Sequence, residues 1–408
     1  MAKTKKVALA LFNRATFGRV KCLIEEMSTY PEFDVTVILG SSVLSKDYDS
    51  PVEYIKRLDN VKFHILNLDN YGSGFSGMTK TASMISFAMA EFLDEHHIDY
   101  GIVVADRFET LPAAMAFSYF NIPVIHIQGG EVTNNIDDRV RHAVTKLSDY
   151  HFASTHLAKE YIFQMGEERN RVHFVGCPSM DLMRTRRIRR SPKERSKDNY
   201  ILCIIHPLTD DVSDLYQKTK MCLDLVVDFC SYHNYRALWY YPNCDPGRES
   251  IKELIDEYLD KYPTVLKKQL NEEPEEFCKK LASCKFIIGN SSSTIRESAY
   301  LGVPAIVIGD RQGFRERADN VITVDYKEDE IKDAMRYQNE MHRYTPSRLY
   351  GDGHSSKAIC YYILKDDPTR KGTLTYPFTL KYNKSHFGDT HKQKYERTSE
   401  RYKITSTT

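Results

Sequence analysis

The stretch YGIVVADRFETLPAAMAFSYFNIPVIHIQGGE, residues 100–131, decides the fold of this 408-residue chain. Residues 100–104 are an apolar run typical of a buried strand, residues 111–120 have apolar side chains at helical spacing, and residues 123–127 predict the next strand. Strands and helices that alternate in this way form a parallel, doubly wound sheet. Ligands of such sheets bind at the carboxyl ends of the strands, which is where Asp106 and Glu131 lie.

The same alternation extends in both directions and occurs twice. Before residue 100 it predicts strands at 7–12, 34–40 and 62–68 and helices at 17–27 and 78–97. After a basic, polar stretch it predicts strands at 200–205, 237–241, 286–289 and 304–308 and helices at 215–232 and 274–283. The sequence therefore predicts an α/β protein of two Rossmann-like, doubly wound domains, residues 1–183 and 200–364, with a linker at 184–199. Residues 365–408 predict a basic, polar tail that is poorly ordered or docked at the periphery.

The composition is that of an ordinary globular protein with no global attraction to polyanions. The formal net charge is +1, and the basic run at residues 186–190 lacks the interleaved aromatic residues of a nucleic-acid site. Nine cysteines without a CxxC pair argue against a disulfide framework or a zinc site. The basic N-terminus precedes a short apolar run that is not a signal peptide, and no stretch approaches the length of a membrane span. We therefore expect a cytoplasmic protein that binds neither nucleic acid nor membranes.

Four acidic residues of the first half lie at or near strand ends: Asp106, Glu131, Asp137 and Asp138. Neighbouring carboxylates in a cleft can have pKa values driven apart, so that one removes a proton and another donates one. Simpler interpretations stay open, because Asp106 could cap a helix and Asp137 with Asp138 could open a helix over 139–147. Magnesium binding also stays open, although the spacing matches no calcium or zinc motif.

Three histidines, His126, His142 and His151, are candidates for proton handling or for contacts with a sugar. His142 lies one turn inside the helix that follows Asp137 and could face the same cleft. The simpler interpretation is that each is a structural histidine.

Residues 289–297, GNSSSTIRE, form a turn of small residues between an apolar strand and a helix. Serine hydroxyls and free backbone N–H groups at a helix start bind anions, although Ser292 or Ser293 could instead serve as a plain helix cap. His206 and Asn243 end two other strands and suit a diphosphate or a ribose, or belong to ordinary turns. Arg14, after the first strand, suits a phosphate or is a solvated loop residue. An acid cluster facing a phosphate site is what an enzyme acting on a nucleotide sugar needs.

Together these motifs resemble the hydrolysing UDP-N-acetylglucosamine 2-epimerase family, in its sialic-acid-pathway branch. The matching stretches are 13–15 (NRA), 106–108 (DRF), 126–132 (HIQGGEV), 136–138 (IDD), 141–146 (RHAVTK), 176–179 (GCPS), 206–207 (HP), 242–243 (PN), 289–292 (GNSS), 296–297 (RE), 309–312 (GDRQ) and 350–353 (YGDG). They span roughly residues 7 to 364, and their order is specific although no single piece is.

The resemblance implies a glycosyltransferase-B-like fold with the ligand in the interdomain cleft. It implies anti elimination of UDP from UDP-N-acetylglucosamine, or from a close UDP-N-acetylhexosamine, and hydration of the resulting glycal to N-acetylmannosamine. No metal or redox cofactor is expected, and a homodimer or homotetramer is. The catalytic residues that it implies are Asp106, Glu131, Asp137 and His206. The substrate-binding residues that we expect, with His142 added from its place in its helix, are Arg14, Arg107, His142, Asn243, Ser291, Ser292, Glu297 and Arg315.

Two positions depart from the family's pattern. The acid that usually follows Arg-Ala in the first motif is Thr16 here, and the glycine that usually precedes Asp-Arg is Ala105. A threonine cannot act as a carboxylate base, and a methyl group at position 105 could crowd the sugar or tilt Asp106. Apart from these two departures, the resemblance implies a hydrolysing epimerase. A glycosyltransferase of the same architecture and a nucleotide-sugar-binding protein without turnover are the alternatives.

Overall fold

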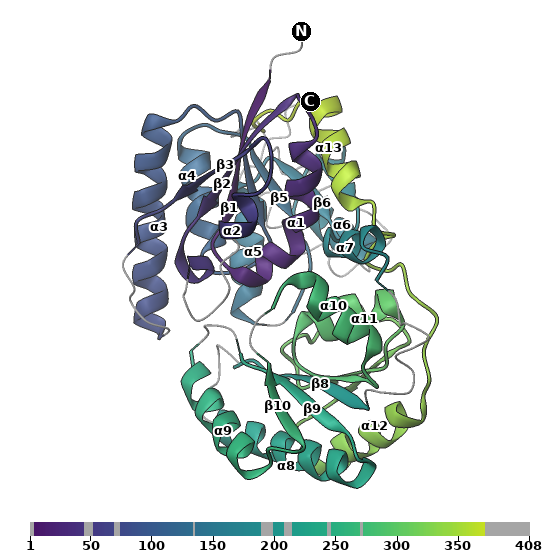
Figure 1. Cartoon of the computed structure of the whole chain (residues 1–408). Coiled ribbons are helices and arrows are strands. Elements are labelled where there is room, and N and C mark those ends of the chain that lie inside the picture. The colour runs from purple at the N-terminus through teal and green to yellow at the C-terminus, as the bar shows by residue number, and fades with distance from the viewer. Residues whose placement is uncertain are drawn as a thin grey trace, which may run out of the picture. The chain divides into compact units, whose positions relative to one another are not determined.

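Figure 1 shows the chain as a computed structural model. The structure describes residues 4–44, 52–68, 74–133, 135–188, 199–207, 214–242, 246–269 and 272–371, without the side chains of Arg14 and Ala15. One compact unit extends to Arg370 and contains two parallel sheets, one from each half of the chain.

The first sheet has seven parallel strands in the order β3-β2-β1-β4-β5-β6-β7. Its central strands are continuous apolar runs because helices cover both faces of the sheet. The strands are β1 (Lys5–Leu11), β2 (Phe33–Leu39), β3 (Val61–Ile65), β4 (Tyr100–Val104), β5 (Val124–Ile127), β6 (Tyr150–Ala153) and β7 (Val172–Phe174). The helices of this half are α1 (Arg14–Ser28), α2 (Val52–Ile55), α3 (Phe75–Glu95), α4 (Thr110–Tyr119), α5 (Ile136–Leu147), α6 (His156–Gln164) and α7 (Ser179–Thr185).

Two apolar clusters, one on each face, hold the first sheet together. One cluster joins α1 and α13 (Ser355–Asp366) to the sheet, and the other joins α3, α4 and α5 to the opposite face. Gly101 in β4 allows the second cluster to pack closely, because a Cβ atom there would lie 2.4 Å from the ring of Phe117 in α4.

The second sheet has six parallel strands in the order β10-β9-β8-β11-β12-β13. Helices α8, α9 and α12 pack on one face, and α10 packs on the other. The strands are β8 (Tyr200–Ile204), β9 (Arg236–Tyr240), β10 (Leu266–Gln269), β11 (Ile287–Gly289), β12 (Ala305–Ile308) and β13 (Val321–Val324). The helices are α8 (Leu215–His233), α9 (Arg248–Lys261), α10 (Pro274–Ser283), α11 (Arg296–Leu301) and α12 (Glu328–Glu340).

The predicted fold class is confirmed: two Rossmann-like, parallel α/β layers of the glycosyltransferase-B type follow one another in the chain. Each predicted strand and helix is present, within a few residues of its predicted ends. The sequence did not predict β6, β7, β10 and β13, which are three or four residues long. Three of them, β7, β10 and β13, are edge strands that are only partly buried, so no continuous apolar run marks them.

The limits of the two predicted domains stay a prediction. Helix α13 begins inside the range predicted for the second domain, 200–364, and ends at Asp366. Its residues Ile359, Cys360 and Ile363 nevertheless pack in the core of the first sheet. Most of the predicted linker, residues 189–198, and most of the predicted tail, residues 372–408, lie outside the described residues.

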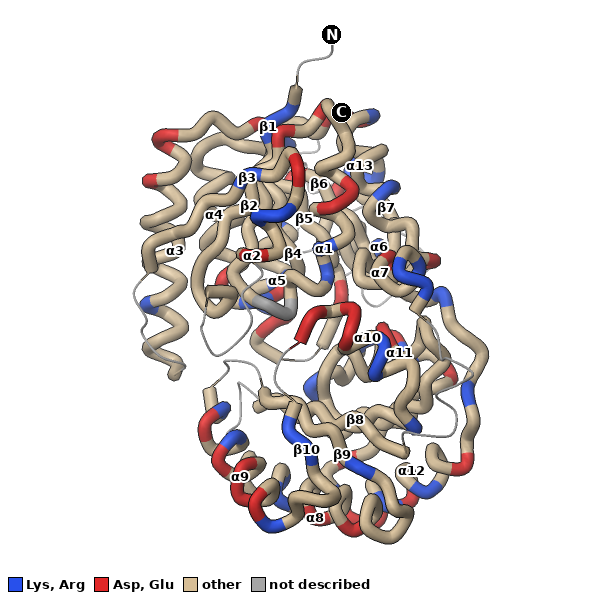
Figure 2. The backbone as a smooth tube through the Cα atoms, in the orientation of Figure 1, with Lys and Arg blue, Asp and Glu red and all other residues tan. Residues whose placement is uncertain are grey.

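Charged residues of both signs are mixed over the helices of the second half, as Figure 2 shows for α8, α9 and α12. The formal net charge of +1 likewise gives no global attraction to anions. Anion binding therefore depends on a local group of side chains.

Candidate active site

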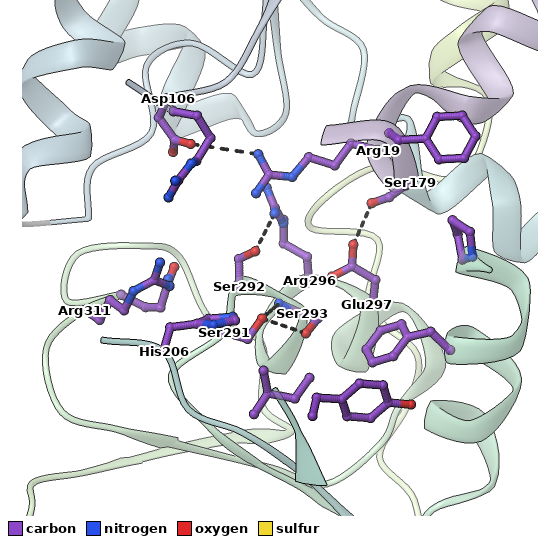
Figure 3. A pocket seen from close by; sticks show the side chains of 18 of the residues that line it. Arg19, Asp106, Ser179, His206, Ser291, Ser292, Ser293, Arg296, Glu297 and Arg311 are labelled. Atoms are coloured by element: carbon purple, nitrogen blue, oxygen red, sulfur yellow. Dashed lines mark hydrogen bonds and ion pairs between the residues drawn. The ribbon is translucent and has the colours of Figure 1, made fainter. Parts of the chain in front are cut away.

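A cavity lined by both halves of the compact unit gathers most of the predicted site residues (Figure 3). The first half contributes α1, the residues after β4 and the start of α5, and the second half contributes the residues after β8, β9 and β11. The cavity therefore lies where strands of both sheets end, as expected for parallel α/β proteins. The predicted residues on its wall are Asp106, Arg107, Asp137, His206, Ser291, Ser292, Glu297 and Arg315.

Guanidinium groups surround the carboxylate of Asp106. Asp106 is 7% exposed and forms an ion pair with Arg141 of α5, and Arg19 and Arg315 each place a nitrogen 3.9 Å from one of its oxygens. Burial raises the pKa of Asp106, but the positive charges of these three arginines lower it by more than burial raises it. The pKa therefore lies well below its usual range. Burial and the charge of Arg296 lower the pKa of the Arg19 guanidinium to about 10. Asp106 is therefore an anion in this arrangement.

Glu131 lies behind Arg315 and is not among the residues on the cavity wall. Its Oε2 atom is 2.6 Å from Arg315 Nη2 and 3.8 Å from Arg296 Nη1, and it also lines a small adjoining pocket with Tyr350. Burial raises the pKa of Glu131, but Arg315, Arg296 and Arg141 lower it on balance. Glu131 is thus linked to the cavity through Arg315 and Arg296, which both line it.

The two acids at the start of α5 have different surroundings. The N-cap of α5 is Asn135, whose side chain accepts a hydrogen bond of 2.9 Å from the backbone N–H of Asp137. The prediction that Asp137 and Asp138 open this helix is correct in one respect, since both lie in its first turn. The helix itself begins at Ile136, before the two acids. Asp137 is on the cavity wall, whereas Asp138 accepts hydrogen bonds of 2.8 Å from the N–H and the hydroxyl of Thr133 and pairs with Arg141.

Asp106 does not cap the helix that follows it, because the N-cap position of α4 is occupied by Glu109. The nearby Arg107 also lines the cavity, and its Nε atom is 3.6 Å from Glu109 Oε2.

The turn after β11 presents three serine hydroxyls to the cavity. Ser291, and not Ser292 or Ser293, is the cap of the short 3-10 helix Ser292–Thr294, since its hydroxyl accepts from Ser293 N–H at 3.4 Å. Ser292 accepts a hydrogen bond of 2.7 Å from Arg296 Nη2. Gly289 allows this turn to leave the sheet, because its φ is +145° and a Cβ atom would lie 1.9 Å from Ile204 O.

Side chains from both halves fix the rest of the wall. The backbone N–H of His206 donates to Asn290 Oδ1 at 2.7 Å, and Asn290 Nδ2 donates to His206 O at 2.9 Å, which ties the end of β8 to the end of β11. Ser179 at the start of α7 donates a hydrogen bond of 2.8 Å to Glu297 Oε1, so that the first half orients a wall residue of the second.

The family model of UDP-N-acetylglucosamine 2-epimerases matches residues 25–364. The chain belongs to this family. It is 31% identical over 376 residues to a Legionella pneumophila protein named UDP-N,N'-diacetylbacillosamine 2-epimerase (hydrolyzing), covering 91% of this chain and 98% of that one. It is 27% identical over 355 residues to a UDP-N-acetylglucosamine 2-epimerase of Neisseria meningitidis, covering 86% and 91% of the two chains.

Solved structures of 2-epimerases share the fold. The Methanocaldococcus jannaschii enzyme in complex with UDP-GlcNAc and UDP superposes with a TM-score of 0.72 at 18% identity, over 88% of this chain and 99% of that one. The Neisseria meningitidis enzyme bound to UDP-GlcNAc gives a TM-score of 0.71 at 19% identity, over 88% and 100% of the two chains. Identities this low show the fold and not the substrate.

Four predicted residues of this 2-epimerase family member do not appear on the cavity wall. Glu131 lies behind it, as described above, and His142 is a partly buried residue of α5 whose pKa burial lowers. Asn243 and the side chain of Arg14 lie outside the described residues. Their roles stay predictions.

The other two candidate histidines of the chain are fully buried. His126 in β5 contacts Ala105 O and Thr145, and His151 in β6 lies 3.4 Å from Glu167 Oε2. Neither lines the cavity.

Three arginines in or beside the cavity, Arg19, Arg141 and Arg296, received no role from the sequence. Arg141 follows Asp138 by three residues in α5, a spacing that puts both on one helix face and could have suggested the pair. Arg19 lies on α1, one turn after Arg14, in a helix of otherwise ordinary pattern. No local signal in the sequence shows that Arg19 and Arg141 meet Asp106, because that contact depends on how α1 and α5 pack.

In the ranges that the structure covers, no group of three or more His, Cys, Asp and Glu side chains is arranged to hold a metal ion. None of the described helices has the length and apolarity to cross a membrane.

Proposed function

We propose that this chain is a hydrolysing 2-epimerase that converts UDP-N-acetylglucosamine, or a close UDP-N-acetylhexosamine, to UDP and the 2-epimeric free sugar, N-acetylmannosamine in the first case. The observation that carries the proposal is one cavity lined by Asp106 and Asp137 from the first half and by Ser291 and Ser292 from the second half. Carboxylates suit proton transfer at the sugar, and hydroxyls with backbone N–H groups suit the diphosphate.

The proposed reaction has two steps. A carboxylate removes the C2 proton, and the bond between C1 and the diphosphate oxygen breaks. UDP departs, and the sugar that remains is a 2-acetamidoglucal. Water then adds its oxygen to C1, and C2 receives a proton on the opposite face. His206 is the candidate proton donor to the leaving oxygen. We assign removal of the C2 proton to one of three carboxylates, those of Asp106, Glu131 and Asp137.

The arginines couple diphosphate binding to the basicity of the acids. In the described arrangement Arg315 and Arg296 interact with Glu131, and Arg315 also lies near Asp106. A bound diphosphate competes with both carboxylates for these guanidinium groups. Removal of a positive neighbour raises the pKa of a carboxylate and makes it a stronger base. Substrate binding is thus expected to activate the acids that the free protein holds at low pKa.

One observation favours a second candidate, a nucleotide-sugar-binding protein without turnover. Asp106 and Glu131 are both tied to arginines and both have lowered pKa values, whereas a general base works best with a pKa near the working pH. Thr16, at the position where the family usually has an acid, is buried beside a small pocket with Arg107 and Glu109. Both candidates require the same cavity and differ only in turnover.

The deciding experiment is incubation in deuterated water with a panel of sugar nucleotides followed by NMR. The panel contains UDP-N-acetylglucosamine, UDP-N,N'-diacetylbacillosamine, for which the Legionella relative is named, and the corresponding GDP sugars. Epimerisation predicts free UDP and a 2-epimeric sugar with deuterium at C2. An intact sugar nucleotide together with a UDP-induced rise in melting temperature would establish binding without turnover. UDP release only after an acceptor is added would instead show a glycosyltransferase.

We also propose the remaining properties that the sequence predicts. They are a cytoplasmic homodimer or homotetramer, domain limits at 1–183 and 200–364, no metal or redox cofactor, and a product that feeds synthesis of sialic-acid-like sugars. Sedimentation of the full chain tests the assembly, and turnover in excess chelator tests the independence from metal.

A further inference from the structure

The residue before Asp106 has an unfavourable backbone conformation. Ala105 has a φ of +61°, in the left-handed region that an alanine rarely adopts. It is 2% exposed, and its N–H donates to Ile127 O at 2.8 Å. A residue in this region costs of order 1 kcal/mol or more, so surrounding contacts must hold it there. Because Asp106 follows directly, the same contacts decide where its carboxylate points.

His126 makes the second contact with this residue. Its Nε2 atom lies 2.9 Å from Ala105 O, and because a carbonyl only accepts, Nε2 carries the proton. Its Nδ1 atom lies 3.2 Å from the hydroxyl of Thr145 in α5. Gly129 leaves room for this contact, since a Cβ atom there would lie 2.8 Å from Nδ1. Burial lowers the pKa of His126 to about 3, so the imidazole is neutral near pH 7.

The same chain of contacts reaches the ion-pair partner of Asp106. The single hydroxyl proton of Thr145 goes either to His126 Nδ1 or to Arg141 O, which lies 3.0 Å from Oγ1, so Thr145 contacts both. Arg141, one turn earlier in α5, forms the ion pair with Asp106. One imidazole therefore touches the backbone before Asp106 and, through Thr145, the helix turn that carries Arg141. Movement of His126 would loosen Asp106 from both sides.

We propose that His126 is a positioning residue, whose neutral imidazole holds Ala105 in the left-handed conformation and thereby directs Asp106 into the cavity. His126 touches no substrate, because it is fully buried and does not line the cavity. The activity that it supports is the proposed epimerisation, so the turnover test below rests on that proposal, whereas the stability test does not.

The turnover test compares His126→Phe with Ala105→Gly and with the double variant. Phenylalanine keeps the ring and loses both hydrogen bonds, and glycine adopts a positive φ without strain. His126→Phe is expected to lower kcat about 100-fold with UDP affinity within about threefold of the parent, because misplacement of a catalytic group by about 1 Å costs that much. Adding Ala105→Gly is expected to recover about tenfold of the loss. Full kcat in His126→Phe, or no recovery in the double variant, would overturn the proposal.

His151→Phe is the matched control. His151 is the register partner of His126 on the neighbouring strand and is equally buried, but it pairs with Glu167, away from Asp106. It is expected to lower the urea midpoint while kcat stays within about twofold of the parent. A loss of kcat equal to that of His126→Phe would show that any defect in this sheet has the same effect, and would refute a specific role.

A protein without turnover still allows the proposal to be tested. If His126 holds Ala105, then Ala105→Gly raises the urea midpoint more in the His126→Phe background than in the parent. Equal effects in the two backgrounds would refute the proposal whatever the enzyme does. Failure of the epimerase hypothesis alone would leave this difference in place.

Discussion

Asp106 combines two properties that a single residue rarely has, namely burial and three guanidinium neighbours. Burial alone would make it a neutral acid, but the arginines keep it ionised. Its negative charge therefore has two consequences. It balances part of the positive charge of the cavity, and Asp106 stays a weak base as long as the arginines are its neighbours.

Replacement of Asp106 by Asn tests these consequences at one residue. We expect turnover to fall at least about 100-fold, the usual contribution of a general acid or base, while UDP still binds. Stability should fall by about 1–3 kcal/mol, because Arg141 loses one charged partner but keeps Asp138. Asp138→Asn is the control, since it also removes a partner of Arg141 but does not lie on the cavity wall. Turnover, UDP calorimetry and urea unfolding separate the two variants, and equal turnover in both would contradict the assignment.

His126 makes stability depend on pH in a predictable direction. Burial lowers its folded pKa to about 3, against about 6.5 in an unfolded chain. The charges that face it from the neighbouring elements are those of Arg141, His151 and Asp106. Between about pH 6.5 and 3 the unfolded chain binds a proton at His126 that the folded protein does not bind. The free energy of unfolding is therefore unaffected by this histidine above pH 6.5 and falls as the pH is lowered towards 3. Urea midpoints measured between pH 7 and 4.5 should fall more steeply for the parent than for His126→Phe, and parallel curves would contradict this expectation.

The turn after β11 is the element that the sequence described best. A strand followed by small residues and a helix is present as predicted, and Ser291, Ser292 and Ser293 line the cavity. That this turn binds an anion stays a prediction. The sequence placed the cap one or two residues too late, because Ser291, Ser292 and Ser293 are equivalent caps by residue type and only the turn geometry separates them.

The double substitution Ser291→Ala and Ser292→Ala tests the anion site as a unit. UDP binding should weaken by about 1–3 kcal/mol, the usual loss for hydrogen bonds to a charged group. Ser298→Ala is the control, because Ser298 lies on α11 but its hydroxyl donates to Thr294 O and not to the cavity. Calorimetry with UDP gives both values. Unchanged affinity in the double variant would place the diphosphate elsewhere.

Other elements lay beyond the reach of the sequence for physical reasons. Strand β10 reads Leu-Lys-Lys-Gln, and its place at the edge of the sheet lets half of its side chains face solvent, so that no apolar run marks it. Helix α13 has an ordinary amphipathic pattern, and nothing local says that it packs on the first sheet. Patterns identify elements, but the contacts between elements distant in sequence depend on the whole chain.

Asp181 shows how such a distant contact is built. It is a buried residue of α7 whose two carboxylate oxygens accept from the N–H groups of Ser355 and Ser356, at 2.9 and 2.6 Å, at the start of α13. Asp181→Ala should cost about 1–2 kcal/mol, as loss of a helix cap does. Asp352→Ala, a largely exposed residue beside the same helix start, should change stability by less than about 0.5 kcal/mol. Urea unfolding compares them, and equal losses would mean that Asp181 does not anchor α13.

At the scale of the whole molecule, contacts between the two halves hold the cavity walls together. Residues of α1 and α7 share an apolar cluster with α10 and α11. Beside it, Lys21 of α1 lies 3.1 Å from Glu273 and 2.8 Å from Glu275 at the start of α10, where Figure 2 shows a group of acidic residues. The side chain of Lys21 is 4% exposed, but that of Glu275 is 16% and that of Glu273 is 49% exposed, so water screens the pair with Glu275 less than the pair with Glu273.

Lys21→Met therefore should affect both stability and ligand binding. Loss of the two pairs should cost about 1–3 kcal/mol, and UDP affinity should fall about 3–10-fold because fewer molecules keep both walls in place. Lys146→Met is the control: Lys146 pairs with the buried Glu167 inside the first half, away from the cavity, so its loss should lower stability and leave UDP affinity unchanged. Urea unfolding and UDP calorimetry on both variants decide the matter. If the two variants lost UDP affinity equally, the effect would come from general destabilisation and not from the contact between the halves.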